Sequence, residues 1–134
     1  MRRTIIAYVA TGLAMLALDA VWLTLMSPRL YQPRLGELLA ARPALEPAVA
    51  FYVVYVAGIV ALAVRPALRD GGWRRLLANA AALGLVAYAT YDLTNQATLK
   101  TWSTTVTLVD MAWGALVTVA AASAGYGTVL RLRD

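Results

Sequence analysis

Four long apolar stretches, separated by short segments that hold most of the charges, constrain this chain more than any other feature. A helix needs about 20 apolar residues to cross the hydrocarbon core of a bilayer. The stretches that reach or approach this length are residues 5–26, 47–64, 76–93 and 106–126. The sequence therefore predicts an all-α integral membrane bundle of four transmembrane helices, forming a single domain over residues 1–134.

Composition supports a membrane protein over a soluble one. Only 14% of the 134 residues are charged, and the mean hydropathy is +0.66. A soluble domain has roughly a quarter of its residues charged, because its surface must be covered. The chain has no cysteine and no histidine, which excludes disulfides, thiolate metal sites and a histidine base. We predict no cofactor, although a bound cation would suit the candidate pocket described below.

The basic residues predict an orientation and argue against a nucleic-acid partner. They lie in short runs between the apolar stretches and do not form one solvated basic face. Cytoplasmic loops of membrane proteins carry an excess of Lys and Arg. Eight basic residues fall on the side of the termini and four on the other: Arg2, Arg3, Arg65, Arg69, Arg74, Arg75, Arg131 and Arg133 against Arg29, Arg34, Arg42 and Lys100. We therefore expect both termini in the cytoplasm and membrane lipids as the surrounding partners.

The longest connection, residues 27–46, would then lie outside. Leu35, Leu38 and Leu39 have helical spacing between Pro33 and Pro43. This pattern is compatible with a short helix lying in the membrane interface and equally with an irregular loop.

Three of the seven acidic residues lie inside apolar stretches, and this is the most informative feature for function. At 1.5 Å per residue, Asp19 and Asp92 would lie about 21 and 24 Å from the inner boundary, and Asp110 about 9 Å below the outer one. In a core of about 30 Å, three helices therefore deliver a carboxylate to the same outer layer. A charge at this depth costs several kcal/mol unless it is paired or neutralised.

Aromatic residues accompany each of these acids. Asp19 and Trp22 are separated by three positions, as are Asp110 and Trp113, and such spacing places both side chains on one helix face. A similar face on the stretch 76–93 and just beyond it carries two tyrosines, an acid and an amide. The candidate ligand-binding residues are Asp19, Trp22, Tyr88, Tyr91, Asp92, Asn95, Asp110 and Trp113. Acids and ring faces together suit an organic cation, and a metal, if one binds, would use the three aspartates.

Three functions remain open from the residues alone, and enzymatic activity is uncertain. The first is a protein that binds or transports a cation, protons or a small protonatable molecule, and so narrow a bundle would need a homodimer to complete a transport path. The second is a membrane enzyme that uses paired carboxylates on a lipid or isoprenoid. The third is a structural or assembly subunit, whose aspartates pair with Arg29, Arg34 or Lys100 or hydrogen-bond between helices.

Three strings around the aspartates carry a resemblance to a known family. They are LDAVWL at residues 18–23, YATYDLTN at 88–95 with ATL at 97–99, and VDMAWG at 109–114. They resemble the bacterial predicted membrane proteins grouped as domain-of-unknown-function family 2177, over essentially the whole chain. The resemblance implies a small multi-pass protein of the bacterial cytoplasmic (inner) membrane, and it supplies no mechanism.

Overall fold

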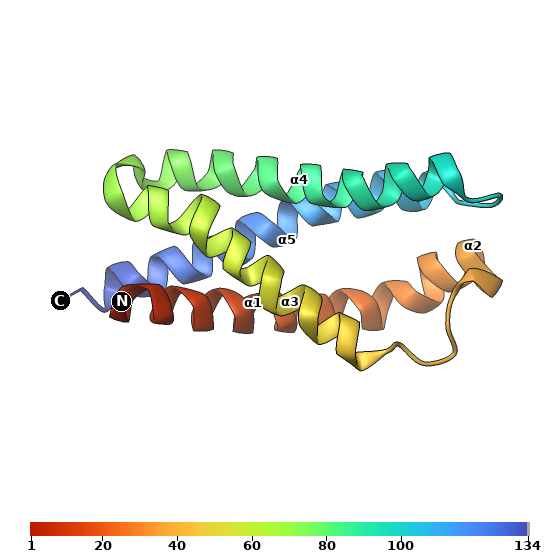
Figure 1. The fold of residues 1–134 in the computed structure, drawn as a ribbon, viewed down its shortest axis with the longest axis horizontal. Coiled ribbons are helices and arrows are strands. Elements are labelled where there is room, and N and C mark those ends of the chain that lie inside the picture. The colour runs from red at the N-terminus through yellow and green to blue at the C-terminus, as the bar shows by residue number, and fades with distance from the viewer. Residues whose placement is uncertain (134) are drawn as a thin grey trace.

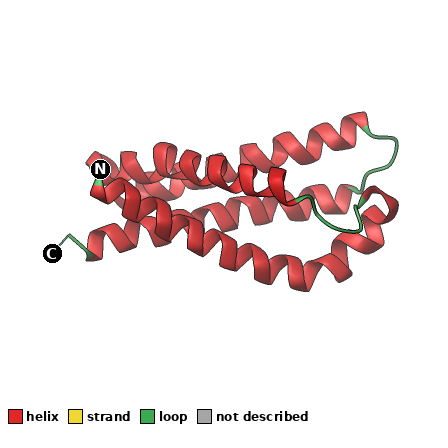
Figure 2. Ribbon diagram, turned by 60° about the horizontal axis from the view of Figure 1, so that its bottom comes forward, coloured by secondary structure: helices red, strands yellow, loops and turns green. Residues whose placement is uncertain are grey.

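A computed structural model describes residues 1–133, and all regular structure within them is helical (Figure 1). Both termini lie at one end of an elongated bundle, here called the terminal end, and Figure 2 shows the two non-helical connections at the opposite, loop end. The elements are α1 (Arg2–Met26), η1 (Ser27–Tyr31), α2 (Gln32–Leu35), η2 (Gly36–Leu38), α3 (Leu45–Ile59), η3 (Val60–Val64), η4 (Ala67–Gly71), α4 (Gly72–Thr98) and α5 (Thr104–Arg131).

Three helical stretches are long and apolar enough to cross a membrane, so the expectation of four separate ones is corrected. These are Arg2–Leu38, Leu45–Thr98 and Thr104–Arg131. The expected second and third spans, 47–64 and 76–93, both fall in the 54-residue stretch Leu45–Thr98. The correction has a simple physical reason: after η3, which ends the expected second span, the π-helical segment η4 continues the backbone hydrogen bonding where the sequence predicts a loop.

This long stretch does not form one straight rod, which at 1.5 Å per residue would measure about 80 Å. The chain turns back at Gly71 and Gly72, and α3 and α4 run in opposite directions away from the turn (Figure 1). Gly72 has a φ of 59°, a conformation that glycine adopts without steric cost. The glycine pair therefore separates two antiparallel legs.

Two expectations stood open for residues 27–46, a short helix or an irregular loop, and the first part of the segment is helical as far as Leu38. Pro28 lacks a backbone N–H for the α-helical ladder, and the chain continues there as a π-helical turn. Leu35 is buried in a small cluster with Leu30 and Val106, so α2 packs against the start of α5. The helical run ends at η2, and non-helical chain leads on to Leu45.

Close helix packing positions the rest of the bundle. A Cβ at Gly84 on α4 would collide with the backbone oxygen of Gly114 on α5. A Cβ at Gly125 would collide with the Thr11 hydroxyl of α1. Small residues therefore let α1 and α4 approach α5 closely, as is common between membrane helices. Ser103 accepts a hydrogen bond from the backbone N–H of Val106 and caps the start of α5.

Candidate functional site

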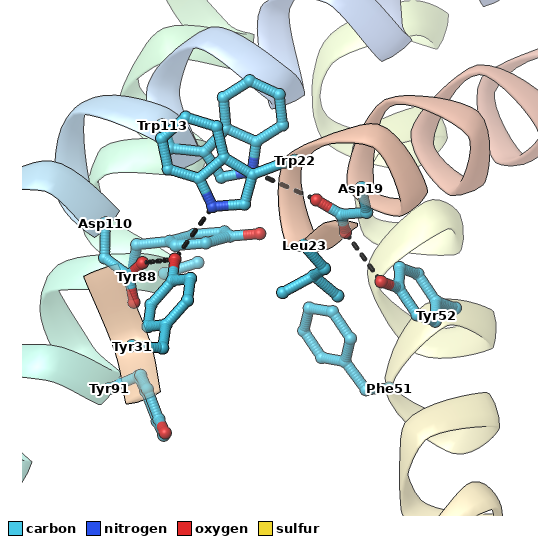
Figure 3. Close-up of a pocket in the computed structure, with 11 residues that line it drawn as sticks. Asp19, Trp22, Leu23, Tyr31, Phe51, Tyr52, Tyr88, Tyr91, Asp110 and Trp113 are labelled. Carbon is cyan, nitrogen blue, oxygen red and sulfur yellow. Dashed lines mark hydrogen bonds between the residues drawn. The ribbon is translucent and has the colours of Figure 1, made fainter. Parts of the chain in front are cut away.

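A cavity of about 490 Å³ lies in the loop half of the bundle (Figure 3). Four long helices and the segment η1 contribute to its wall. Two of the eleven lining residues are acids and seven are aromatic: Asp19, Trp22, Leu23, Tyr31, Phe51, Tyr52, Ala87, Tyr88, Tyr91, Asp110 and Trp113. The volume falls in the range of about 300–1,000 Å³ that is usual for small-molecule sites.

The three aspartates lie at similar heights along their helices. Asp19 precedes the end of α1 by seven residues, Asp92 precedes the end of α4 by six, and Asp110 follows the start of α5 by six. At the helical rise of 1.5 Å per residue, these offsets correspond to about 9–11 Å from the loop end of each helix. The structure therefore places the three acids in one layer of the bundle.

Asp19 accepts a hydrogen bond on each carboxylate oxygen. The Tyr52 hydroxyl donates to Oδ2 over 2.7 Å, and the Trp113 indole N–H donates to Oδ1 over 3.1 Å (Figure 3). The side chain is only 7% exposed. Two donors from α3 and α5 therefore hold this α1 acid in place and offset part of its desolvation cost.

Asp110 is held from the other side of the cavity. The Tyr31 hydroxyl donates to its Oδ1, and the Trp22 indole N–H donates to the Tyr31 oxygen over 2.9 Å. Figure 3 shows this relay of Trp22, Tyr31 and Asp110 on the wall opposite Tyr52. An α5 acid is thus fixed by residues of α1 and of the η1 segment that follows it.

The two Asp-x-x-Trp motifs are crossed. Trp22 and Trp113 stack with ring centroids 4.2 Å apart and planes inclined by 7°. Since α1 and α5 run in opposite directions, each tryptophan serves the acid of the other helix: Trp113 contacts Asp19 directly, and Trp22 reaches Asp110 through Tyr31. The repeated motif is explained by this antiparallel packing.

A second aromatic group supports the cavity from α3 and α4. Phe51 stacks on Tyr55 at 5.2 Å, and Tyr55 meets Tyr88 edge to face at 6.3 Å. The Tyr55 hydroxyl is also hydrogen-bonded to the Thr118 hydroxyl of α5 over 2.7 Å. A Cβ at Gly114 would strike the Tyr88 ring, so this glycine makes room for the ring.

Asp92 does not line the cavity. Its side chain is fully buried, and no N–H or O–H group of residues 1–133 donates to either carboxylate oxygen. Asp92 therefore lies behind the cavity wall.

Six of the eight residues expected to bind a ligand line the cavity. They are Asp19, Trp22, Tyr88, Tyr91, Asp110 and Trp113. Asp92 is buried outside it, and Asn95 is half-buried one turn further along α4. A role in ligand binding stays a prediction for all of them.

Of the structural alternatives for the aspartates, hydrogen bonds between helices are found at Asp19 and Asp110, whereas pairing with a basic residue is not seen within residues 1–133. The ion pair found there joins Arg75 to Asp70 at the turn before α4, so the three intramembrane acids are not paired with Arg29, Arg34 or Lys100. In the same part of the chain, no group of three or more acidic side chains is arranged to hold a metal ion. The carboxylates are therefore satisfied by neutral donors or left without one.

Sequence reasoning missed three aromatic residues of the wall: Tyr31, Phe51 and Tyr52. Tyr31 follows α1 in the η1 segment, and its hydroxyl points inward to Asp110 (Figure 3). Tyr52 and Phe51 lie in the second apolar stretch, where no polar neighbour marks them. A tyrosine hydroxyl within an apolar span was the available signal, because a buried hydroxyl needs a partner.

The comparison with protein families shows what this chain belongs to. An all-helical membrane fold with an acidic, aromatic cavity defines the class only as a multi-pass membrane protein. The chain is a member of the family described as predicted membrane protein (DUF2177), whose model matches residues 4–127. No curated protein and no solved structure matches it.

Proposed function

We propose that this membrane protein binds a small organic cation or protonated amine in the cavity, as a binding protein or transporter. The observation that carries the proposal is a pair of buried carboxyl groups, Asp19 and Asp110, on the wall of an aromatic cavity, to which no basic side chain of residues 1–133 is paired. A ligand cation would supply the missing counter-charge.

Energetics favour a charged ligand over an apolar one. An ionised carboxylate in a membrane interior is costly unless it is paired, and such residues usually mark a ligand or ion path. Neutral donors reach Asp19 from Tyr52 and Trp113, but they bring no positive charge. A cation between Asp19 and Asp110 would interact with both carboxylates in surroundings of low dielectric constant.

The chemistry of the wall favours an organic cation over a hard metal ion. Calcium takes six to eight oxygen ligands, whereas both oxygens of Asp19 already accept hydrogen bonds. Seven aromatic side chains line the cavity. Tryptophan and tyrosine faces attract ammonium groups, and methylated ammonium ligands are bound in aromatic cages of this kind.

We also propose that the chain crosses the bacterial inner membrane four times with both termini in the cytoplasm. The turn at Gly71 and Gly72 divides Leu45–Thr98 into two legs, and each leg is long enough to cross the hydrocarbon core. The arginine-rich turn and the termini share one end of the bundle, in agreement with the excess of basic residues on cytoplasmic segments. The cavity would then lie in the outer half, and a second copy would complete a transport path.

Binding of tetramethylammonium to the full chain in nanodiscs tests this proposal. The readout is the fluorescence of Trp22 and Trp113, measured in a W73F/W102F variant so that the cavity pair is observed alone. We expect saturable quenching, weakened roughly thirtyfold or more by Asp19→Asn and by Asp110→Asn, since loss of one partner of a buried charge pair costs at least about 2 kcal/mol.

The controls separate charge recognition from general effects. Asp70→Asn neutralises an exposed acid at the turn and should leave tetramethylammonium binding unchanged. The uncharged tert-butanol, of similar size, should not quench, and neither should sodium chloride at equal ionic strength. Equal binding of tert-butanol, or an equal loss in the Asp70 variant, would overturn the proposal.

A further inference from the structure

The cavity has an opening between α3 and α4. The two legs approach each other near the turn, where α4 packs against η3 and η4, and they have little contact further on. Figure 1 shows them diverging toward the loop end. Residues of both legs nevertheless line the same cavity, with Phe51 and Tyr52 on α3 and Ala87, Tyr88 and Tyr91 on α4. The cavity therefore lies between the diverging legs of the hairpin.

The rim of this opening carries uncharged side chains, of which two are apolar and one is a tyrosine. Leu23, Phe51 and Tyr91 line the cavity and yet are 49%, 45% and 57% exposed, which places them at its rim. Figure 3 shows Phe51 and Tyr91 on opposite sides of an open space. Beyond Glu46 and up to the end of α3 no charged residue occurs. In a bilayer, hydrocarbon chains would face such an edge, whereas an opening toward water usually carries polar residues.

From this geometry we infer that the ligand is an amphiphile, with a cationic head at Asp19 and Asp110 and an alkyl chain that leaves between α3 and α4 into the bilayer. The inference rests on the proposed function, because it specifies the ligand class of the same cavity. The acids lie about 9–11 Å inside the loop ends of their helices, so a head group bound to them would be at the depth of the hydrocarbon layer.

An entry route through the bilayer also accounts for the composition of the wall. Apart from two acids, the lining consists of aromatic and aliphatic side chains that would contact a chain along its length. The head leaves the interface for the carboxylates, while the chain stays in an apolar environment throughout. Only the charged group must then be compensated, and the two acids supply that compensation.

A homologous series of ligands tests the opening. Tetramethyl-, butyltrimethyl-, octyltrimethyl- and dodecyltrimethylammonium share one head and differ in chain length. Quenching is measured in nanodiscs as above, below concentrations that dissolve the bilayer, and the signal of an Asp19→Asn/Asp110→Asn double variant is subtracted as non-specific partitioning. The apparent affinity should rise along the whole series, by up to about fourfold for each added methylene group.

A cavity closed toward the bilayer would behave differently. Its 490 Å³ would accommodate the short members, and the affinity would level off or fall as the chain outgrows it. Phe51→Ala, which removes a ring from the rim, should weaken dodecyltrimethylammonium several-fold more than it weakens tetramethylammonium. Leu116→Ala, at a 65% exposed position of α5 outside the cavity, is the matched control and should change neither.

The outcomes separate this inference from the proposed function. If tetramethylammonium binds in a carboxylate-dependent manner and the longer chains bring no gain, the lateral opening is wrong and the cation site stands. If no member of the series depends on the acids, both proposals are wrong. A Phe51→Ala effect that is equal for short and long ligands would also overturn the lateral opening, because the ring would then act only on the head group.

Discussion

The terminal half of the bundle and its loop half use the same four long helical segments and pack them in different ways. In the terminal half, residues such as Ala63, Ala80, Ala121 and Gly125 are buried at helix contacts. In the loop half, the stacked pair of Trp22 and Trp113 and the ring of Tyr88 stand between the helices. The helix backbones are therefore in close contact in the terminal half, whereas aromatic rings separate the helices in the loop half.

This difference in packing shows how a chain of 134 residues can combine closely packed helices at one end with a cavity at the other. Small residues allow close approach, which excludes both water and ligand. Large rings keep the helices apart, and their polar edges can hold buried acids in place. The closely packed region and the cavity meet at Gly114. Its backbone contacts Gly84, and the absence of a Cβ leaves space for the Tyr88 ring.

Adding one methyl group in the closely packed region should give the largest loss of stability. In Gly84→Ala, the new Cβ would collide with the Gly114 carbonyl oxygen, which cannot move without shifting α5. We expect a loss of about 2 kcal/mol or more in the free energy of unfolding, measured in detergent micelles. Gly58→Ala is the control, because a Cβ there meets no atom within 4 Å. Equal effects of the two variants would contradict the contrast in packing.

Removing an acid from the loop half should have the next largest effect. Asp19→Ala leaves the Tyr52 hydroxyl and the Trp113 N–H without their acceptor. The expected loss is about 1–2 kcal/mol in the same unfolding experiment, because each buried donor then lacks a partner. Asp70→Ala, which breaks an exposed pair with Arg75, should cost less than about 1 kcal/mol. The reverse order would mean that the acids of the cavity are already hydrated.

Replacing one of the stacked indoles should cost less. Trp113→Phe keeps an aromatic ring against Trp22 but removes the N–H that reaches Asp19. We expect a loss of about 1 kcal/mol, which is the usual contribution of one hydrogen bond. Trp73→Phe, in the edge-to-face pair with Tyr126 at the terminal end, should cost less, since no hydrogen bond is lost there. Thermal unfolding of the two variants side by side measures this difference.

Neutralising the acid behind the cavity wall should have the smallest effect. Asp92→Asn keeps the side-chain shape and removes a carboxylate that has no donor among residues 1–133. Its free energy of unfolding should stay within about 1 kcal/mol of the parent protein. Tetramethylammonium binding should also persist, in contrast to its loss in Asp19→Asn. If binding is lost in Asp92→Asn as well, this residue belongs to the site despite its position outside the cavity.

Periodicity and hydropathy predicted the all-helical fold well, and they failed where the backbone hydrogen bonding takes an unusual course. The apolar stretches coincide with α1, with α3 and η3, with α4 and with α5. Pro28 and the segment 65–71 read as breaks, because proline and charge usually end a helix. The π-helical turns at those places join the segments, and their hydrogen bonds depend on packing that a sequence pattern does not contain.

For the cavity too, the sequence predicts features of a single helix but not the contacts between helices. The spacing of Asp19 and Trp22 predicts a shared helix face, since it depends on one helix alone. The partnership of Tyr52 with Asp19 depends on how α3 crosses α1, which spacing does not encode. On α4, Tyr88 faces the cavity while Asp92, four residues later, is rotated enough to be buried behind it.

The crossed arrangement of the two Asp-x-x-Trp motifs couples α1 to α5 mechanically. Each helix carries the acid that the other helix holds, so a sliding movement of α1 along α5 would separate Trp113 from Asp19 and the Trp22–Tyr31 pair from Asp110 in the same step. The contacts of Asp19 with Trp113 and of Asp110 with Tyr31 would therefore form together and be lost together.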